Sequence, residues 1–284
     1  MLRLSVIVPA FNEEATIVEL LSRVGRQQLE GVELEVIVVD DGSTDRTLEL
    51  LQARPDLYGR LLQMPVNGGK GAAVKAGLEA ATGDYVLFQD ADLEYEPDDY
   101  RLLLEPVLRH DADLVMGSRL NAPQFTRVHY FWHKVGNQVL SLTFNVLNNT
   151  TFTDIYTCYL LFRRSLLDVG ALGTSGWEQQ AEILSQIVPR AEVIYEVPIN
   201  YHGRTYAQGK KIRAHHTVAV IQAIVSGWAR ERSPLAPILR ALRSRPGPGL
   251  APRDLTPTPG PSANGGSQTA AGTSGPPATH GARA

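Results

Sequence analysis

Two aspartates one residue apart, Asp90 and Asp92, are the residues of this chain whose type and spacing point most directly to chemistry. They follow the apolar run YVLF at residues 85–88, which is too short for a helix and is typical of a buried strand. Carboxylate oxygens suit Mg²⁺ or Mn²⁺, and Mg²⁺ usually binds through one or two carboxylates together with substrate phosphates. A solvated acidic turn is the alternative for this segment taken alone. The spacing therefore favours a divalent-metal site, provided that phosphate-binding residues lie close to these two aspartates in the fold.

Basic residues that would bind phosphate follow other strand-like segments. Lys70 lies in the glycine-rich segment NGGKG, and Arg119 follows an apolar run. Arg204 and Lys210 lie in a polar segment, where solvated basic side chains are the ordinary alternative. The glycine-rich segment is not a Walker loop, because a glycine stands where Ser or Thr must follow the lysine. A metal on one side and Lys or Arg on the other would stabilise a departing diphosphate.

The elements expected to position these residues alternate along the first part of the chain. Apolar runs, several of them rich in β-branched residues, predict strands at 4–9, 34–39, 61–65, 85–88 and 113–117, with helices between them. This alternation predicts an α/β fold with a Rossmann-like, mostly parallel sheet flanked by helices. Ligands bind beyond the carboxyl ends of such strands. One rim is therefore expected to carry Glu13, Asp40, Asp41, Lys70, Asp90, Asp92 and Arg119. Asp40 or Asp41 would accept hydrogen bonds from a nucleobase or a ribose.

The pattern changes after residue 121. It predicts helices at 130–147, 177–188 and 215–230, and strands at 159–162 and 193–198. The first and last of these helices are amphipathic, which is typical of core packing and also of helices that lie in a membrane interface. After residue 233 the chain is rich in Pro, Gly, Ala, Ser and Thr, so we expect no packed structure beyond about Arg245.

Composition excludes several classes of protein. The net charge of −3 gives no positive field that would recruit a nucleic acid. Cys158 is the single cysteine, so neither a disulfide framework nor a cysteine metal cluster is expected, as in a reducing compartment. No apolar stretch is long enough to span a membrane, and the first residues lead straight into a strand-like run. We expect a cytoplasmic protein, with peripheral contact to the inner face of the cell membrane left open, and no stable protein partner is evident.

Several ordered segments resemble family 2 glycosyltransferases of the GT-A fold. These segments are SVIVPAFNE at 5–13, VVDDGSTD at 38–45, NGGKGAA at 67–73, DADL at 90–93 and GSR at 117–119. Their order, together with YHGRTYAQGKK at 201–211, most resembles the dolichyl-phosphate mannose synthase-like branch of polyprenyl-phosphate glycosyltransferases. The resemblance covers roughly residues 4–228 and rests on the ordered set, since no single motif is specific.

The resemblance implies transfer of a sugar from a UDP- or GDP-linked donor to a polyprenyl phosphate, with inversion at the anomeric carbon and with Mg²⁺ or Mn²⁺ as cofactor. It implies a GT-A domain at 1–230, with a nucleotide-sugar-binding half at 1–120 and an acceptor-binding half at 121–230, followed by a disordered tail at 231–284. By position, the residues implied around the nucleoside are Pro9, Phe11, Glu13, Val38 and Asp40. Those implied at the metal and diphosphate are Asp90, Ala91 and Asp92, with Glu94 as a third metal ligand. Those implied at phosphates of donor or acceptor are Arg119, Arg204 and Lys210.

Chemistry separates two classes of acceptor. A hydroxyl acceptor needs a general base, normally a carboxylate, whereas a phosphate is already an anion at neutral pH. The cations Arg119, Arg204 and Lys210 favour a phosphate. For the alternative, a sugar hydroxyl in a cell-envelope polysaccharide or glycolipid, Asp154 is the expected base, and a helix or turn cap is its other reading. The catalytic candidates are therefore Asp92, Arg119 and Asp154.

Two other functions remain as alternatives. A nucleotidyltransferase would use the same kind of sheet and metal pair, but it needs a glycine-rich basic loop after the first strand. This chain has the acidic segment AFNE at 10–13 in that place. A silent nucleotide-sugar-binding module need not keep both aspartates and all three cations, so the residues favour an enzyme.

Overall fold

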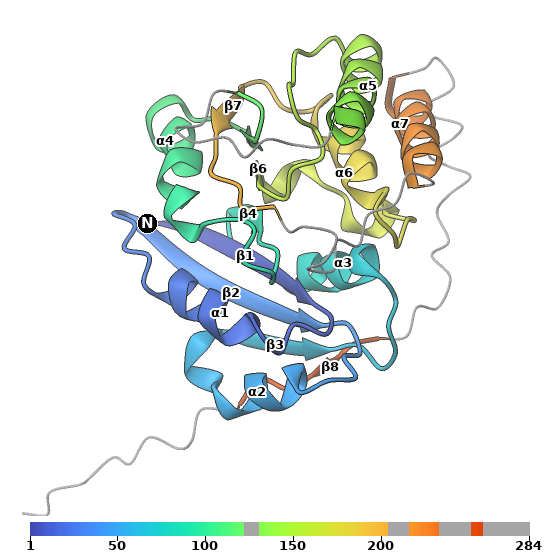
Figure 1. The fold of residues 1–284 in the computed structure, drawn as a ribbon. Coiled ribbons are helices and arrows are strands. Elements are labelled where there is room, and N and C mark those ends of the chain that lie inside the picture. Colours follow the sequence, from blue (N-terminus) through green and yellow to red (C-terminus); the bar gives the residue numbers. More distant parts are fainter. Residues whose placement is uncertain (122–130, 204–215, 233–250, 258–284) are drawn as a thin grey trace, which may run out of the picture.

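The computed structural model describes residues 1–121, 131–203, 216–232 and 251–257. These residues contain one sheet of eight strands, covered by helices (Figure 1). The strands are β1 (Leu2–Ala10), β2 (Val32–Asp40), β3 (Arg60–Gln63), β4 (Tyr85–Phe88), β5 (Leu114–Ser118), β6 (Leu160–Arg163), β7 (Ile194–Pro198) and β8 (Arg253–Asp254). Their order across the sheet is β7-β5-β6-β4-β1-β2-β3-β8.

Most neighbours in the sheet are parallel. β1 pairs in parallel with β2 and β4, β2 with β3, and β5 with β7. By contrast, β6 runs antiparallel between β4 and β5, and β8 runs antiparallel to β3. The predicted α/β class with a mostly parallel sheet is confirmed.

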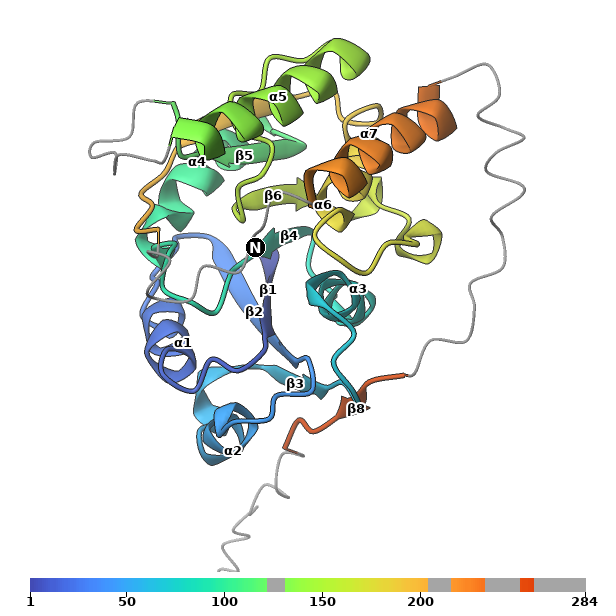
Figure 2. The same ribbon diagram turned by 45° about the vertical axis from the view of Figure 1, so that its right-hand side comes forward.

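Helices lie on both faces of the sheet. They are α1 (Ile17–Gly25), α2 (Thr47–Ala53), α3 (Lys70–Ala80), α4 (Tyr100–His110), α5 (Phe131–Asn148), α6 (Gln179–Ile187) and α7 (His216–Arg232). Short 3-10 turns lie at Pro55–Leu57, Pro97–Asp99, Arg164–Leu166 and Val169–Ala171. Figure 2 shows α1 and α3 on opposite sides of β1 and β2; α7 packs against α6, and α5 packs against α7. The predicted strands and helices agree with these bounds to within a few residues.

The central strands are apolar because both of their faces are covered. In β1, Leu4, Val6, Ile7 and Val8 are fully buried, and β4 is buried along its whole length. A strand that is covered on both faces is expected to form a continuous apolar run, and this is the pattern that predicted these strands. The polar residues begin where each strand leaves the core, so the fold places them together at one edge of the sheet.

The expectation of no packed structure beyond about Arg245 is wrong for residues 251–257. Strand β8 pairs with β3 in the register Leu62↔Asp254, and Arg60 forms an ion pair with Asp254 at 3.0 Å. The backbone N–H of Leu61 also donates to the hydroxyl of Thr256 at 3.1 Å. An edge strand presents unpaired backbone groups, and even a short segment can pair with them. Composition averaged over the tail hides this segment; the rest of the tail after α7 lies outside the described residues.

Helices α5 and α7 each carry apolar side chains that are buried in the core and others that are exposed. Phe144 of α5 and Ile224 of α7 are fully buried, so core packing explains one face of each helix. Leu142 and Val218 lie on exposed faces of the same two helices. None of the helices within the described ranges has the length and the apolar character that crossing a membrane requires.

Candidate active site

A pocket opens beyond the carboxyl ends of β4 and β5, where the start of α3 meets the start of α6. Its walls carry carboxylates, cations, aromatic rings and small residues. The lining residues are Lys70, Gly71, Val74, Phe88, Asp90, Asp92, Glu94, Tyr95, Arg119, Tyr156, Cys158, Gly176, Trp177, Gln179, Gln180, Ile183 and Tyr201. The fold thus brings five of the predicted site residues together: Lys70, Asp90, Asp92, Glu94 and Arg119.

The turn that carries the two aspartates is held from below by a buried glutamine. Gln89 is fully buried, and its side-chain oxygen accepts hydrogen bonds from the hydroxyls of Tyr100 (2.8 Å) and Tyr159 (2.9 Å). Its side-chain N–H donates to the carbonyl oxygen of Asp90 at 3.0 Å. Beyond it, a carboxylate oxygen of Asp92 accepts from the backbone N–H of Glu94 at 3.1 Å. These contacts fix the backbone from which both aspartates project.

Lys70, the first residue of α3, joins the acidic turn. Its Nζ lies 2.5 Å from a carboxylate oxygen of Asp90 and 5.2 Å from the ring centroid of Trp177. Burial alone would lower the pKa of Lys70, but the carboxylate of Asp90 raises it above its usual value, so the ammonium stays charged. A Cβ on Gly71 would lie 2.5 Å from the backbone carbon of Ser175. The glycine after the lysine is therefore needed because a second loop rests directly on this helix start.

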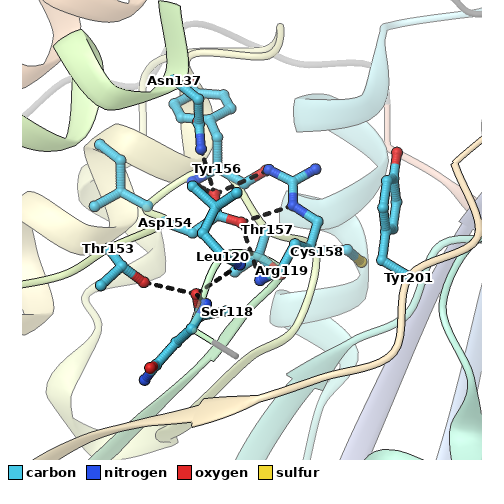
Figure 3. Close-up of polar contacts among 12 residues, drawn as sticks. Ser118, Arg119, Leu120, Asn137, Thr153, Asp154, Tyr156, Thr157, Cys158 and Tyr201 are labelled. Atoms are coloured by element: carbon cyan, nitrogen blue, oxygen red, sulfur yellow. Dashed lines mark hydrogen bonds and ion pairs between the residues drawn. The ribbon is translucent and has the colours of Figure 1, made fainter. Parts of the chain in front are cut away.

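Arg119 and Asp154 form the most buried ion pair of the site (Figure 3). The Nε of Arg119 donates to one carboxylate oxygen at 2.7 Å and Nη2 donates to the other at 2.9 Å. Asn137 also donates to this carboxylate at 2.8 Å, and Nη2 of Arg119 donates to the carbonyl of Tyr156 at 2.8 Å. Burial would raise the pKa of Asp154, but the guanidinium holds it below its usual value. The carboxylate is thus a fixed anion that orients Arg119.

The expected role of Asp154 as a general base is not supported by this geometry. Its side chain is completely buried and does not line the pocket, and both of its oxygens accept hydrogen bonds from Arg119. A general base must reach the proton that it removes, directly or through one water. Asp154 is therefore assigned here as a residue that positions Arg119.

Glu94 lies in the pocket but its carboxylate contacts a tyrosine. The hydroxyl of Tyr201 donates to Glu94 at 2.6 Å, and the Tyr201 ring centroid lies 5.0 Å from the guanidinium carbon of Arg119. Across the described ranges, no three His, Cys, Asp or Glu side chains form a group that could hold a metal ion. The expected set of three carboxylates is thus not assembled. Two carboxylates, Asp90 and Asp92, together with a diphosphate remain a sufficient donor set for Mg²⁺ or Mn²⁺.

The residues expected around the nucleoside lie outside the pocket lining, at the ends of β1 and β2. Asp40 is fully buried, and one of its carboxylate oxygens has no hydrogen-bond partner among the described residues. Asp41 accepts hydrogen bonds from the backbone N–H groups of Gly68 and Gly69, both at 2.9 Å, so it holds the turn before α3. Burial raises the pKa of both aspartates.

The other expected residues differ in burial. Val38 is fully buried within β2 and Ala91 is buried between the two pocket aspartates. Pro9 near the end of β1, and Phe11 and Glu13 just after it, are partly exposed; the backbone N–H of Glu13 donates to the hydroxyl of Thr47 at 2.8 Å. Arg204 and Lys210 lie outside the described residues, so their contacts stay predictions.

Several pocket residues were not predicted from the sequence. Trp177 and Tyr201 contact the two pocket cations, and Cys158 forms part of the wall. Burial raises the pKa of the Cys158 thiol well above its usual value, so the thiol is neutral. An aromatic residue in a loop is an ordinary feature of a sequence. The one usable signal was the position of Tyr201 at the start of the basic segment 201–211.

Comparison with known proteins bears on the family. Residues 5–170 match the model of glycosyl transferase family 2. The chain is 30% identical over 250 residues to the low-salt glycan biosynthesis hexosyltransferase Agl6 of Haloferax volcanii, covering 87% of this chain and 57% of that relative. It is 34% identical over 169 residues to the undecaprenyl-phosphate 4-deoxy-4-formamido-L-arabinose transferase of Pseudomonas aeruginosa, covering 58% of this chain and 48% of that relative. The chain spans about half the length of these curated relatives.

A solved structure shows the same fold. Glucosyl-3-phosphoglycerate synthase from Mycobacterium tuberculosis, in complex with Mn²⁺, UDP-glucose and phosphoglyceric acid, matches with a TM-score of 0.61 and 23% identity over 80% of both chains. At this identity the likeness concerns the fold, and it confirms the expected GT-A architecture. The family match covers more than half of the chain, including the acidic turn, Lys70 and Arg119. The chain therefore belongs to glycosyl transferase family 2.

Proposed function

We propose that this protein transfers a sugar from a UDP- or GDP-linked donor to a polyprenyl phosphate, with inversion at the anomeric carbon and with Mg²⁺ or Mn²⁺ bound. One observation carries the proposal. The pocket joins the aspartate pair to two tethered cations, Lys70 and Arg119, whereas the carboxylate behind Arg119 is buried. This arrangement suits a reaction in which one phosphate group leaves and another attacks.

On the donor side, Asp90 and Asp92 would hold the metal, and oxygen ligands of this kind match Mg²⁺ and Mn²⁺. When bound, the metal neutralises the diphosphate and makes it a better leaving group. Lys70 would bind the same diphosphate, because its ammonium already contacts Asp90. The unpartnered oxygen of Asp40 would accept a hydrogen bond from the base or ribose, since a buried acceptor without a partner is costly.

On the acceptor side, Arg119 would bind the phosphate of the lipid. A phosphate oxygen would attack the anomeric carbon as the bond to the diphosphate breaks, and the diphosphate would leave with the bonding electrons. No proton has to be removed from the acceptor, so the reaction needs a positioned cation more than a base. The bidentate contact with Asp154 fixes the plane of the Arg119 guanidinium. The Pseudomonas relative, which is named as an undecaprenyl-phosphate sugar transferase, supports an acceptor of this class.

A lipid acceptor implies contact with a membrane surface, and α5 and α7 provide a suitable face. The exposed fractions of their apolar side chains reach 69% for Phe131, 63% for Leu142, 73% for Val146 and 62% for Val218. Amphipathic helices bind membrane interfaces through such a face. Peripheral contact at the cytoplasmic side of the membrane is therefore part of the proposal.

The test is nucleoside diphosphate release from a panel of UDP- and GDP-sugars with Mn²⁺, with and without farnesyl phosphate as a short polyprenyl phosphate. Release that requires the lipid is the expected result, whereas release that requires only a sugar acceptor would overturn the acceptor assignment. Asp92→Ala should abolish release while the far-UV circular dichroism stays native. The exposed Asp98, in the 3-10 turn that precedes α4, gives the matched control: Asp98→Ala should retain activity.

A further inference from the structure

Tyr201 is held between the two halves of the pocket by its backbone as well as by its side chain. It forms an antiparallel bridge with Tyr95, and the next N–H, that of His202, donates to the carbonyl of Glu94 at 2.8 Å. One residue earlier, Asn200 donates from its backbone N–H to the buried Asp99 at 2.7 Å. The segment that follows β7 is therefore hydrogen-bonded to the chain around Glu94, Tyr95 and Asp99. These backbone contacts determine where the Tyr201 ring lies.

The side chain of Tyr201 contacts both functional sides of the pocket. Its hydroxyl donates to the carboxylate of Glu94 at 2.6 Å, and its ring centroid lies 5.0 Å from the guanidinium carbon of Arg119. Figure 3 shows Tyr201 on one side of Arg119 and Asp154 on the other. The guanidinium thus lies between the carboxylate of Asp154, to which it donates, and the face of the Tyr201 ring.

We propose that Tyr201 is a positioning residue with two separable roles. Its ring holds the guanidinium of Arg119 in the orientation that receives the acceptor phosphate, and its hydroxyl holds the carboxylate of Glu94 in place through their hydrogen bond. The first role rests on the proposed function, because it assumes that Arg119 binds a phosphate. The second concerns only the contact between two side chains.

Elementary physics supports both roles. Arginine stacks on aromatic faces by cation–π attraction, and the planar guanidinium loses less freedom for each contact because its donors form a rigid fork. A hydroxyl that donates to a carboxylate makes a charge-assisted hydrogen bond, which is stronger than a neutral one. Removing the hydroxyl and removing the ring should therefore have different consequences.

Double-mutant cycles measured by urea unfolding test the contacts without any substrate. Tyr201→Phe combined with Glu94→Gln should be non-additive by about tenfold in the unfolding equilibrium constant, as expected for a hydrogen bond to a charged group. Tyr201→Leu combined with Arg119→Lys should be non-additive by about threefold or more. Tyr58→Phe removes a buried hydroxyl that donates to Leu51 far from the pocket, and it should be additive with both partners. Additive cycles for Tyr201 would overturn the proposal.

Ligand binding then tests what the contacts do. In calorimetry with farnesyl phosphate, Tyr201→Phe should bind within twofold of the wild type, and Tyr201→Leu should bind about 3- to 30-fold more weakly. Equal lipid affinity in the Phe and Leu variants would refute the role of the ring, and additivity of Tyr201→Phe with Glu94→Gln would refute that of the hydroxyl. A wild type that binds no farnesyl phosphate would refute the proposed function and with it the role of the ring, while the Glu94 cycle would still decide the role of the hydroxyl.

Discussion

The ion pair between Lys70 and Asp90 predicts how much the affinity for Mn²⁺ should change when the lysine is removed. In the absence of a donor, the ammonium neutralises one of the two aspartates that are expected to hold the metal. A cation that approaches this pair must compete with the lysine. A bound diphosphate would attract the ammonium and leave the aspartate to the metal, so metal and nucleotide are expected to bind cooperatively.

Lys70→Met removes the competing charge. Two unit charges about 4 Å apart interact by about 4 kcal/mol at an effective dielectric constant of about 20. The side chains of Lys70 and Asp90 are 28% and 22% exposed, and solvent screening reduces this to about 1–2 kcal/mol. Since 1.4 kcal/mol is a factor of ten, Mn²⁺ should bind the variant without nucleotide roughly 5- to 30-fold more tightly than it binds the wild type. The cooperativity between Mn²⁺ and UDP or GDP should shrink by the same factor.

Isothermal titration calorimetry with Mn²⁺, with and without UDP or GDP, measures both quantities. Lys75→Met provides the matched control, because Lys75 lies on the same helix and donates to the carbonyl of Leu172 at 3.0 Å without lining the pocket. The control removes the same net charge and should change Mn²⁺ affinity by less than twofold. If Lys70→Met binds Mn²⁺ as weakly as the wild type does, or more weakly, the lysine does not compete for the metal ligand and the reasoning fails.

Two further predictions concern stability. The pKa of Asp154 is lowered in the folded state, so its contribution is present above the unfolded value of about 4 and is lost as pH falls through the lower folded value. In urea titrations, the stability advantage of the wild type over Asp154→Asn should shrink as pH falls from 7 toward 3; a constant difference would exclude this linkage. Truncation after residue 250 removes β8 and should lower the melting temperature by about 2–8 °C for a loss of about 1–3 kcal/mol, whereas truncation after residue 257 should not.

The sequence predicted the framework well because the framework is encoded locally. Each central strand is covered on both faces and is therefore a short apolar run, and each run ends in the polar residues that form the rim. Asp90, Asp92 and Arg119 could be placed at the pocket for this reason. Lys70 followed the same rule, since it comes after the third strand.

The contacts that the sequence did not predict are those that depend on a distant partner. Asp154 was expected to be a base because nothing local shows that it pairs with Arg119, which lies 35 residues earlier. The contact of Glu94 with Tyr201 was not predicted because it joins residues 107 positions apart, and the role of Glu94 as a metal ligand stays a prediction. Both carboxylates accept hydrogen bonds as expected of an anion, but their donors are side chains far away in the sequence: Arg119 for Asp154 and Tyr201 for Glu94. The pairing of β8 with β3 was missed for the same reason, since it brings together residues nearly 200 positions apart.

The two cations of the pocket are tethered in different ways, and the difference fits the two phosphates of the proposed reaction. The tether of Lys70 lies inside the pocket on a partly exposed aspartate, so an arriving diphosphate can displace it. The tether of Arg119 is completely buried, and removing either partner would leave an unpaired charge in the protein interior. Arg119 is therefore held in one place before any ligand binds. A leaving group whose charge grows during the reaction is served by a cation that can move toward it, whereas an attacking phosphate is served by a cation that already has the productive position.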